Sequence, residues 1–94
     1  MYDLNGDPAY LEIPDRIMRA IVRWAKEGHW PGGFVAAVMR NDLLDAVCRA
    51  DAEVALHLKG IVRFVYNQCP SQCHGSREKM EAWQKKMAEK EVTQ

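Results

Sequence analysis

The sequence predicts an all-α fold, and three observations support that prediction. Apolar residues recur at spacings of three and four along most of the chain after residue 13, as on one face of a helix. No segment shows the alternation of apolar and polar residues that is typical of a half-buried strand. The length of 94 residues fits one small domain. We therefore expect a single domain over residues 1–94, built as a small helical hairpin with one helix before it and one after it.

The first twelve residues are predicted to form an irregular N-terminal arm. Asn5-Gly6-Asp7-Pro8 combines residue types that favour turns. Tyr10 follows this turn, and its ring can serve in one of two ways. It can cover the protein's own core, which is the common use of a tyrosine ring, or it can offer a surface on which a base stacks.

The first helix is predicted over residues 13–28. Pro14 suits the first helical position, where its missing N–H costs nothing, and Asp15 suits the positive end of the helix dipole. Gly28 is suited to end the helix. The apolar face is formed by Ile17, Ile21, Trp24 and Ala25. The other side carries four basic residues and one acidic residue, which predicts a solvated face with an excess of positive charge.

The helical hairpin is predicted to begin after the turn Pro31-Gly32-Gly33. Two consecutive glycines bend the backbone sharply and leave it without side-chain cover. A helical pattern then continues to Asn67, with breaks indicated at Asn41-Asp42 and at Arg49-Ala50-Asp51. Asp42 is followed three residues later by Asp45, which resembles a capping box.

A loop over residues 68–75 separates this region from a last helix. Ser76 is predicted to cap that helix, which runs from Arg77 to about Glu89 with a thin apolar stripe. Residues 91–94 should fray, as chain ends commonly do.

Two glycine-containing turns are candidate anion sites. The first backbone N–H groups of a helix have no partner inside it and lie at its positive end, so the N–H groups at Gly32 and Gly33 can bind phosphate. A plain turn between two helices is the alternative. Arg77 lies in the first turn of the last helix, where the helix dipole disfavours a cation. It is either a second phosphate contact or the partner of an acidic side chain.

Charge and composition exclude several classes of function. Thirteen basic and thirteen acidic residues cancel, so any phosphate recognition must come from a few placed residues. No segment has the roughly 18 consecutive apolar residues of a membrane span, and the acidic, polar start does not predict a signal peptide. Three cysteines fit a reducing compartment, so we expect a cytoplasmic protein. With 48% hydrophobic residues in so short a chain, we also expect it to oligomerise.

No catalytic constellation is evident in the sequence. It shows no paired carboxylates, nucleophile elbow or phosphate-binding loop. Cys69, Cys73 and His74 lie in one loop, but a zinc site needs a fourth ligand, which would have to be Cys48 or another histidine. A Cys–His nucleophilic pair lacks a third group to orient it. We therefore expect no catalytic residue, no bound metal and no cofactor.

A set of short motifs lies between residues 31 and 84. They are Pro31-Gly32-Gly33-Phe34, Asn41-Asp42-Leu43, Arg49-Ala50-Asp51, Ile61-Val62, Val65-Tyr66-Asn67, Pro70, Cys73, Gly75-Ser76, Glu78-Lys79 and Trp83. Together they resemble the hairpin domain of small phage anti-defence sponge proteins, a family that includes phage inhibitors of cyclic-oligonucleotide (CBASS) immunity and of Thoeris immunity. The resemblance implies a non-enzymatic protein that sequesters cyclic nucleotide signals in the host cytoplasm and keeps the host effector inactive.

The short N-terminal arm is similar to that of the anti-CBASS branch of this family. The resemblance implies a homo-oligomer, a hexamer arranged as a trimer of dimers, with separate pockets for cyclic dinucleotides and cyclic trinucleotides. It implies that Tyr10 and Lys26 bind the cyclic dinucleotide. It also implies backbone contacts from Gly32 and Gly33, and a phosphate contact from Arg77, in the cyclic trinucleotide pocket. No membrane and no DNA partner is expected.

The separation of Tyr10 and Lys26 indicates that two chains form such a pocket. With a helix over residues 14–27, they stand roughly 15–20 Å apart. In an antiparallel two-fold pair, Tyr10 of one chain meets Lys26 of the other, and the site is symmetric, as a cyclic dinucleotide is or nearly is. Bases would stack on Tyr10, and Lys26 would neutralise phosphate.

Three other functions are also consistent with the sequence. An anti-Thoeris sponge would share the fold and bind a cyclic ADP-ribose isomer. A helix-turn-helix DNA-binding regulator could use Pro31-Gly32-Gly33 as its turn, although zero net charge and the apolar segment that follows disfavour it. The third is an interaction protein that binds no small ligand.

Overall fold

The computed structural model describes residues 8–92, with side chains described for residues 10–89. Helices form most of this range, and it contains no strand. The elements are α1 (Pro8–Leu11), α2 (Asp15–Glu27), α3 (Gly33–Met39), α4 (Leu43–Arg49), α5 (Ala52–Leu56), α6 (Leu58–Gln68), the 3-10 turn η1 (Ser71–Cys73) and α7 (Arg77–Val92). Within residues 8–92 no helix combines the length and the apolar character that a bilayer span requires. The all-α prediction is confirmed for this part of the chain.

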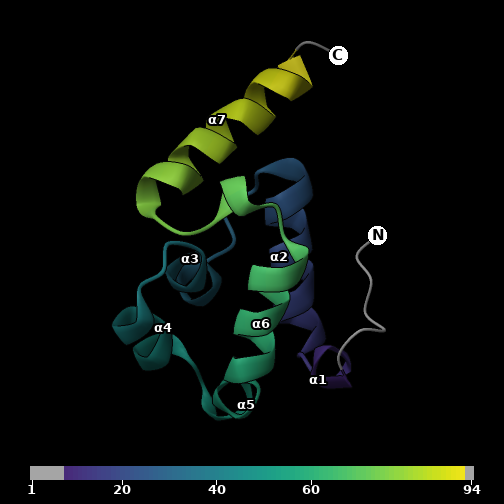
Figure 1. The fold of residues 1–94 in the computed structure, drawn as a ribbon, viewed down its shortest axis with the longest axis vertical. Coiled ribbons are helices and arrows are strands. Elements are labelled where there is room, and N and C mark those ends of the chain that lie inside the picture. The colour runs from purple at the N-terminus through teal and green to yellow at the C-terminus, as the bar shows by residue number, and fades with distance from the viewer. Residues whose placement is uncertain (1–7, 93–94) are drawn as a thin grey trace.

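The helices surround one core, with α7 across one end of the molecule and α1 and α5 at the other (Figure 1). Helix α2 contacts α3 and α7, helix α6 contacts α1 and α5, and α3 contacts α4. Helix α7 also contacts η1, which precedes it in the chain. The largest fully buried side chains are Trp24, Phe64, Ile21, Met39, Ile61, Met80, Val54 and Cys73. They come from six different elements, so segments distant in sequence meet in this core.

Helix α2 forms where the sequence predicts the first helix. Pro14 stands immediately before its first residue, and Gly28 ends it in a left-handed conformation with φ 72°. The Gly28 N–H donates to the Trp24 carbonyl at 3.0 Å. A Cβ at position 28 would lie only 2.6 Å from Cβ of Met87. Glycine therefore ends α2 and also lets α7 approach it closely.

The predicted hairpin is divided into four short helices, α3 to α6. The helical run breaks at Asn41-Asp42 and at Ala50-Asp51 as predicted, and an aspartate caps each new helix. Asp42 Oδ1 accepts a hydrogen bond from the Asp45 N–H at 3.1 Å, and Asp51 Oδ1 accepts one from the Val54 N–H at 2.9 Å. A further break, at His57 between α5 and α6, is not indicated by the apolar pattern, which stays helical across it.

The two ends of the described range differ from the prediction. Pro8–Leu11 forms the helical turn α1, where an irregular arm is predicted, because this segment packs against α6. The turn residues Asn5-Gly6-Asp7 lie outside the described residues. Helix α7 continues to Val92 and so includes two of the residues that are predicted to fray. Residues 93–94 lie outside the described range.

Two tryptophan N–H groups tie η1 and α7 to α2. Trp24 Nε1 donates to the Cys73 carbonyl at 3.0 Å, and Trp83 Nε1 donates to the Trp24 carbonyl at 3.1 Å. Both bonds are buried, and a buried polar group left unpaired would cost about 1–3 kcal/mol. These bonds therefore fix the position of η1 and α7 on the rest of the chain.

Candidate functional site

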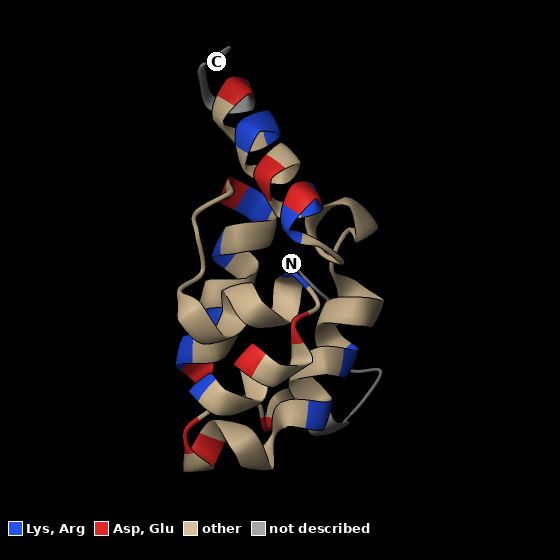
Figure 2. Cartoon of the chain, turned by 90° about the vertical axis from the view of Figure 1, so that its left-hand side faces the viewer, with Lys and Arg blue, Asp and Glu red and all other residues tan. Residues whose placement is uncertain are grey.

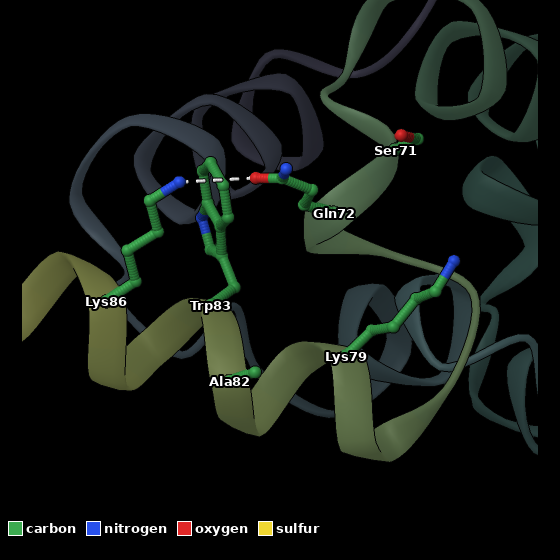
Figure 3. A pocket seen from close by; sticks show the side chains of 6 residues that line it. All are labelled: Ser71, Gln72, Lys79, Ala82, Trp83 and Lys86. Carbon is green, nitrogen blue, oxygen red and sulfur yellow. Dashed lines mark hydrogen bonds between the residues drawn. The ribbon is translucent and has the colours of Figure 1, made fainter.

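Two cavities adjoin each other where η1 leads into α7. The first, here named the tryptophan chamber, has a volume of about 320 Å³ and is lined by Ser71, Gln72, Lys79, Ala82, Trp83 and Lys86 (Figure 3). The second, the tyrosine chamber, has a volume of about 380 Å³ and is lined by Val38, Asn41, Val62, Val65, Tyr66, Ser71, His74, Gly75 and Lys79. Ser71 and Lys79 line both chambers. Each volume lies within the range of small-molecule binding sites.

The α7 side of the tryptophan chamber follows from helical spacing. Residues 79, 82, 83 and 86 share one face of α7, because residues three, four and seven apart do so in a helix. The Trp83 indole is held by its bond to α2, and Lys86 Nζ lies 5.4 Å from the centre of its ring. Lys86 Nζ also donates to Gln72 Oε1 at 3.3 Å, which joins α7 to η1 (Figure 3). An aromatic ring, an amide and an ammonium group therefore line one cavity.

Lys79 lies where the two chambers meet. Ser76 Oγ accepts a hydrogen bond from the Lys79 N–H at 3.1 Å, and the Gly75 N–H donates to the Met39 carbonyl at 2.6 Å, so the first turn of α7 is fixed. Lys79 forms no ion pair with any residue that the structure describes. No carboxylate is found among the described side chains that line either chamber. Lys79 and Lys86 thus line cavities in which no described residue is acidic, although acidic and basic residues both occur on the surface (Figure 2) and the net charge is zero.

The tyrosine chamber combines an exposed ring with an apolar wall. Tyr66 is 78% exposed, and Val62, one turn earlier on α6, is 44% exposed, so the two share an open face of this helix. Val38 contributes to the chamber from α3. Asn41 follows that helix in a left-handed conformation with φ 65°, which asparagine tolerates better than most residues. This combination suits a flat aromatic group with polar atoms at its edge.

The fold shifts the pKa of His74 and of the buried thiol Cys69 beside it. Burial lowers the pKa of His74 and the positive charge of Lys79 lowers it too, while a hydrogen bond to the Cys69 backbone acts in the opposite direction. Nε2 of His74 is buried and has no hydrogen-bond partner in the described part of the chain. A hydrogen bond with Cys73, together with burial, raises the pKa of the Cys69 thiol. Among the described residues no three His, Cys, Asp or Glu side chains gather so as to hold a metal ion.

The structure does not bring Tyr10 and Lys26 together within one chain. Tyr10 is 4% exposed, its ring meets that of Phe64 edge to face at 5.2 Å, and its hydroxyl accepts a hydrogen bond from Asn67 Nδ2 at 3.1 Å. Lys26 is exposed in the last turn of α2, about 17 Å along the axis from the first residue of that helix, and Tyr10 precedes that residue in α1. Of the two uses open to the Tyr10 ring, the one observed is to cover the protein's own core.

The two glycine turns lie at opposite ends of α3. Gly32 and Gly33 stand at its beginning, whereas the Gly75 N–H is bonded to Met39, its last residue. Seven residues of helix separate these points by about 10 Å. Within a single chain the two turns are therefore separate, and a ligand that contacts both would have to span the length of α3.

At each candidate anion turn one arginine, Arg49 or Arg77, is already paired with an acidic side chain. A Cβ at position 33 would lie 2.5 Å from Nη1 of Arg49, so this side chain covers Gly33, and Arg49 Nε donates to Asp45 at 3.0 Å. Arg77 Nε lies 3.4 Å from Glu81 Oε2, and both side chains are exposed. Of the two roles considered for Arg77, pairing with an acidic side chain is the one observed.

The sequence alone does not identify the residues that line the chambers. Tyr66, Lys79 and Trp83 occur in the motifs described above, but with no role of their own, and Gln72 and Lys86 are not singled out. The spacing of Lys79, Trp83 and Lys86 on one helical face is the signal that was available. No local signal places Gln72 beside them, because η1 reaches α7 only through the fold.

Comparisons of this chain with protein-family models, with curated proteins and with solved structures each found no match.

Proposed function

We propose that this chain is a phage anti-defence protein that binds cyclic dinucleotide and cyclic trinucleotide signals and holds them without degrading them. By lowering the free concentration of these signals in the host cytoplasm, it blocks activation of host CBASS effectors. The motif resemblance supplies the class of ligand. The observation that carries the proposal is the pair of adjoining chambers with Lys79 between them and no carboxylate among the described residues that line them.

The chambers match the two kinds of group in a cyclic oligonucleotide, which are flat bases and phosphates. Lys79 and Lys86 can each form a charge-assisted hydrogen bond to a phosphate oxygen, and the exposed ring of Tyr66 can stack on a base. The two lysines are seven residues apart on α7, which is about 10 Å along the helix axis. A ligand that uses both lysines must carry more than one anionic group, and cyclic oligonucleotides do.

The groups around the chambers favour binding over hydrolysis. Cleavage of a phosphodiester by a side-chain nucleophile requires that nucleophile to be activated by a neighbouring base. Ser71 lines both chambers and His74 lines one, but Nε2 of His74 has no hydrogen-bond partner among the residues that the structure describes. A sponge requires only that the signal is bound, and the aromatic, amide and lysine side chains of the chambers can bind it without a reaction.

We also propose that the chain self-associates, as a hexamer built from three dimers. Leu43, Leu44 and Val47 are adjacent on α4 and are 69%, 80% and 52% exposed. Neighbouring exposed apolar side chains of this kind commonly mark a protein–protein contact. Light scattering at micromolar concentration should report a mass several times that of the chain. A mass equal to that of one chain, 10.8 kDa, would exclude the hexamer.

The direct test is calorimetry with a panel of cyclic dinucleotides, cyclic trinucleotides and a cyclic ADP-ribose isomer. Gln72→Glu places a carboxylate beside Lys86 with almost no change in shape, and should weaken binding of the cyclic nucleotides at least tenfold, or about 1.4 kcal/mol. Gln84→Glu is the matched control, because it adds the same charge to α7 outside both chambers.

The panel also separates the other functions considered. Tight binding of the cyclic ADP-ribose isomer alone would indicate an anti-Thoeris sponge, and no binding of any member would overturn the proposal. Chromatography should recover the ligand intact after long incubation, whereas linear products would indicate a phosphodiesterase. Binding of duplex DNA with a steep salt dependence would favour a DNA-binding regulator.

A further inference from the structure

We propose that the tyrosine chamber is a nucleobase subsite, in which an adenine base stacks on Tyr66 and bonds at its edge to the Asn41 amide while its phosphate contacts Lys79. The inference rests on the proposed function for the presence of a phosphate on the ligand. It adds the kind of base, the residues that hold it and the orientation of the ligand across η1.

Tyr66 is placed as a stacking surface should be. The other tyrosine of the described range, Tyr10, is 4% exposed and packs on Phe64. Tyr66, in contrast, is 78% exposed, so its ring is open to a ligand. Val62 and Val38 line the same chamber, so the ring borders an apolar wall and does not project alone into solvent. A base on Tyr66 would therefore bury its face against the ring and its rim against two valines.

Asn41 supplies the groups that bond to the edge of a base. Its side chain forms no hydrogen bond with the residues that the structure describes, and it lines the chamber beside Tyr66. A side-chain amide has a donor and an acceptor next to each other, and adenine presents the matching amino group and ring nitrogen. Asn41 has a left-handed backbone conformation, with φ 65°, in which glycine would be less strained. The side-chain amide is therefore present at a position where the backbone alone would favour glycine.

The connection between the chambers sets the orientation of the ligand. Lys79 and Ser71 line both, so a base in the tyrosine chamber places its phosphate at Lys79, and the rest of the ligand continues toward Lys86. Lys79 is thus next to the base subsite, and Lys86 lies in the adjoining tryptophan chamber. A nucleotide has a base for the subsite and phosphates for the lysines, whereas a simple inorganic anion can contact only the lysines.

Two probes separate base from phosphate: cyclic di-AMP, which has both, and inorganic pyrophosphate, which has only the second. Calorimetry should show that Tyr66→Leu weakens cyclic di-AMP binding about 10- to 100-fold, the range for loss of one stacked base, and leaves pyrophosphate binding unchanged. Tyr66→Phe keeps the ring and should bind almost as the wild type does. Asn41→Gly removes the amide without straining the backbone and should weaken cyclic di-AMP about 3- to 10-fold.

The controls distinguish failure of this inference from failure of the proposed function. Lys79→Met should weaken both probes, and Leu56→Ala, at an 82% exposed residue outside both chambers, should change neither. If Tyr66→Leu binds cyclic di-AMP as tightly as the wild type does, the base subsite is wrong although sequestration stands. The same conclusion follows if the wild type binds pyrophosphate as tightly as cyclic di-AMP. If the wild type binds none of the cyclic nucleotides of the panel, the proposed function fails and this inference fails with it.

Discussion

The turn at Gly32 and Gly33 and the turn at Gly75 each begin a helix beside a basic side chain, and they differ in what that side chain already binds. Above Gly33, Arg49 Nε donates to both carboxylate oxygens of Asp45 at 3.0 Å. Beside Gly75, Lys79 Nζ lies 3.4 Å from the point that a Cβ at position 75 would occupy. Lys79 has no acidic partner among the described residues.

From this difference we expect the local pairing of charges, and not the net charge, to decide which turn binds an anion. Asp45 lies between Arg49 and Arg40 and is bonded to both. The hydrogen bond from Arg49, and then that from Arg40, lowers the pKa of Asp45, so its carboxylate stays ionised and neutralises the surroundings of Gly33. The Gly75 turn opens instead into the tyrosine chamber, which is lined by Lys79 and by no described acidic residue.

The largest expected effect comes from adding a Cβ at each turn. Gly75 has φ 119°, a conformation that residues with a Cβ rarely adopt, so Gly75→Ala should lower the free energy of unfolding by about 1–3 kcal/mol. Gly33→Ala should change it by less than about 0.5 kcal/mol, because the new methyl group meets only the far end of the flexible Arg49 side chain, and alanine favours a helix. Urea unfolding measures both, and equal losses would show that the two turns do not differ in this way.

The second effect concerns the cations themselves. Lys79→Met should weaken cyclic di-AMP binding tenfold or more, since a hydrogen bond to a charged group contributes about 1.5–3 kcal/mol. Arg49→Met should leave binding within about twofold, because Arg49 is already bonded to Asp45. Calorimetry on the two variants compares the turns directly. A larger loss for Arg49→Met than for Lys79→Met would assign the anion site to the Gly33 turn.

Local rules predict much of this fold and little of its candidate site. Helix α2, its end at Gly28 and the breaks at Asn41-Asp42 and Ala50-Asp51 follow from spacing, glycine conformation and aspartate caps. The break at His57 does not, because the apolar residues on either side keep a helical spacing across it. The roles of the two tyrosines also depend on tertiary contacts. Tyr10 is buried where α1 packs on α6, whereas Tyr66, on α6 itself, remains exposed.

A smaller effect is expected at the Gly75 turn when the pH is lowered from 7.5 to 5. Burial lowers the pKa of His74 below its usual value of about 6.5, and Lys79, the charged side chain that shares its chamber, lowers it too. The unfolded chain therefore binds this proton at a higher pH than the folded chain does. The contribution of His74 to the free energy of unfolding is therefore complete above about pH 6.5, and it decreases as the pH falls below that value.

Urea unfolding between pH 7.5 and 5 should give a steeper decline for the wild type than for His74→Gln. The difference between the two proteins isolates His74 from the carboxylates that titrate at lower pH. Parallel declines would mean that His74 does not contribute to the pH dependence of the Gly75 region.

The smallest effect is expected at Arg77, which is two residues from Lys79 but points to a nearly opposite side of α7, since each residue turns a helix by about 100°. Its side chain is 73% exposed and pairs with Glu81 at 3.4 Å, and such pairs contribute about 0.2–0.5 kcal/mol. Arg77→Ala should therefore leave cyclic di-AMP and cyclic tri-AMP affinities within about twofold.

The family resemblance implies instead that Arg77 contacts phosphate in the cyclic trinucleotide pocket. A loss of tenfold or more with cyclic tri-AMP for Arg77→Ala, and none for Lys79→Met, would move the phosphate contact to the exposed start of α7. Because Arg77 is so exposed in a single chain, that result would also require a second chain to complete the pocket.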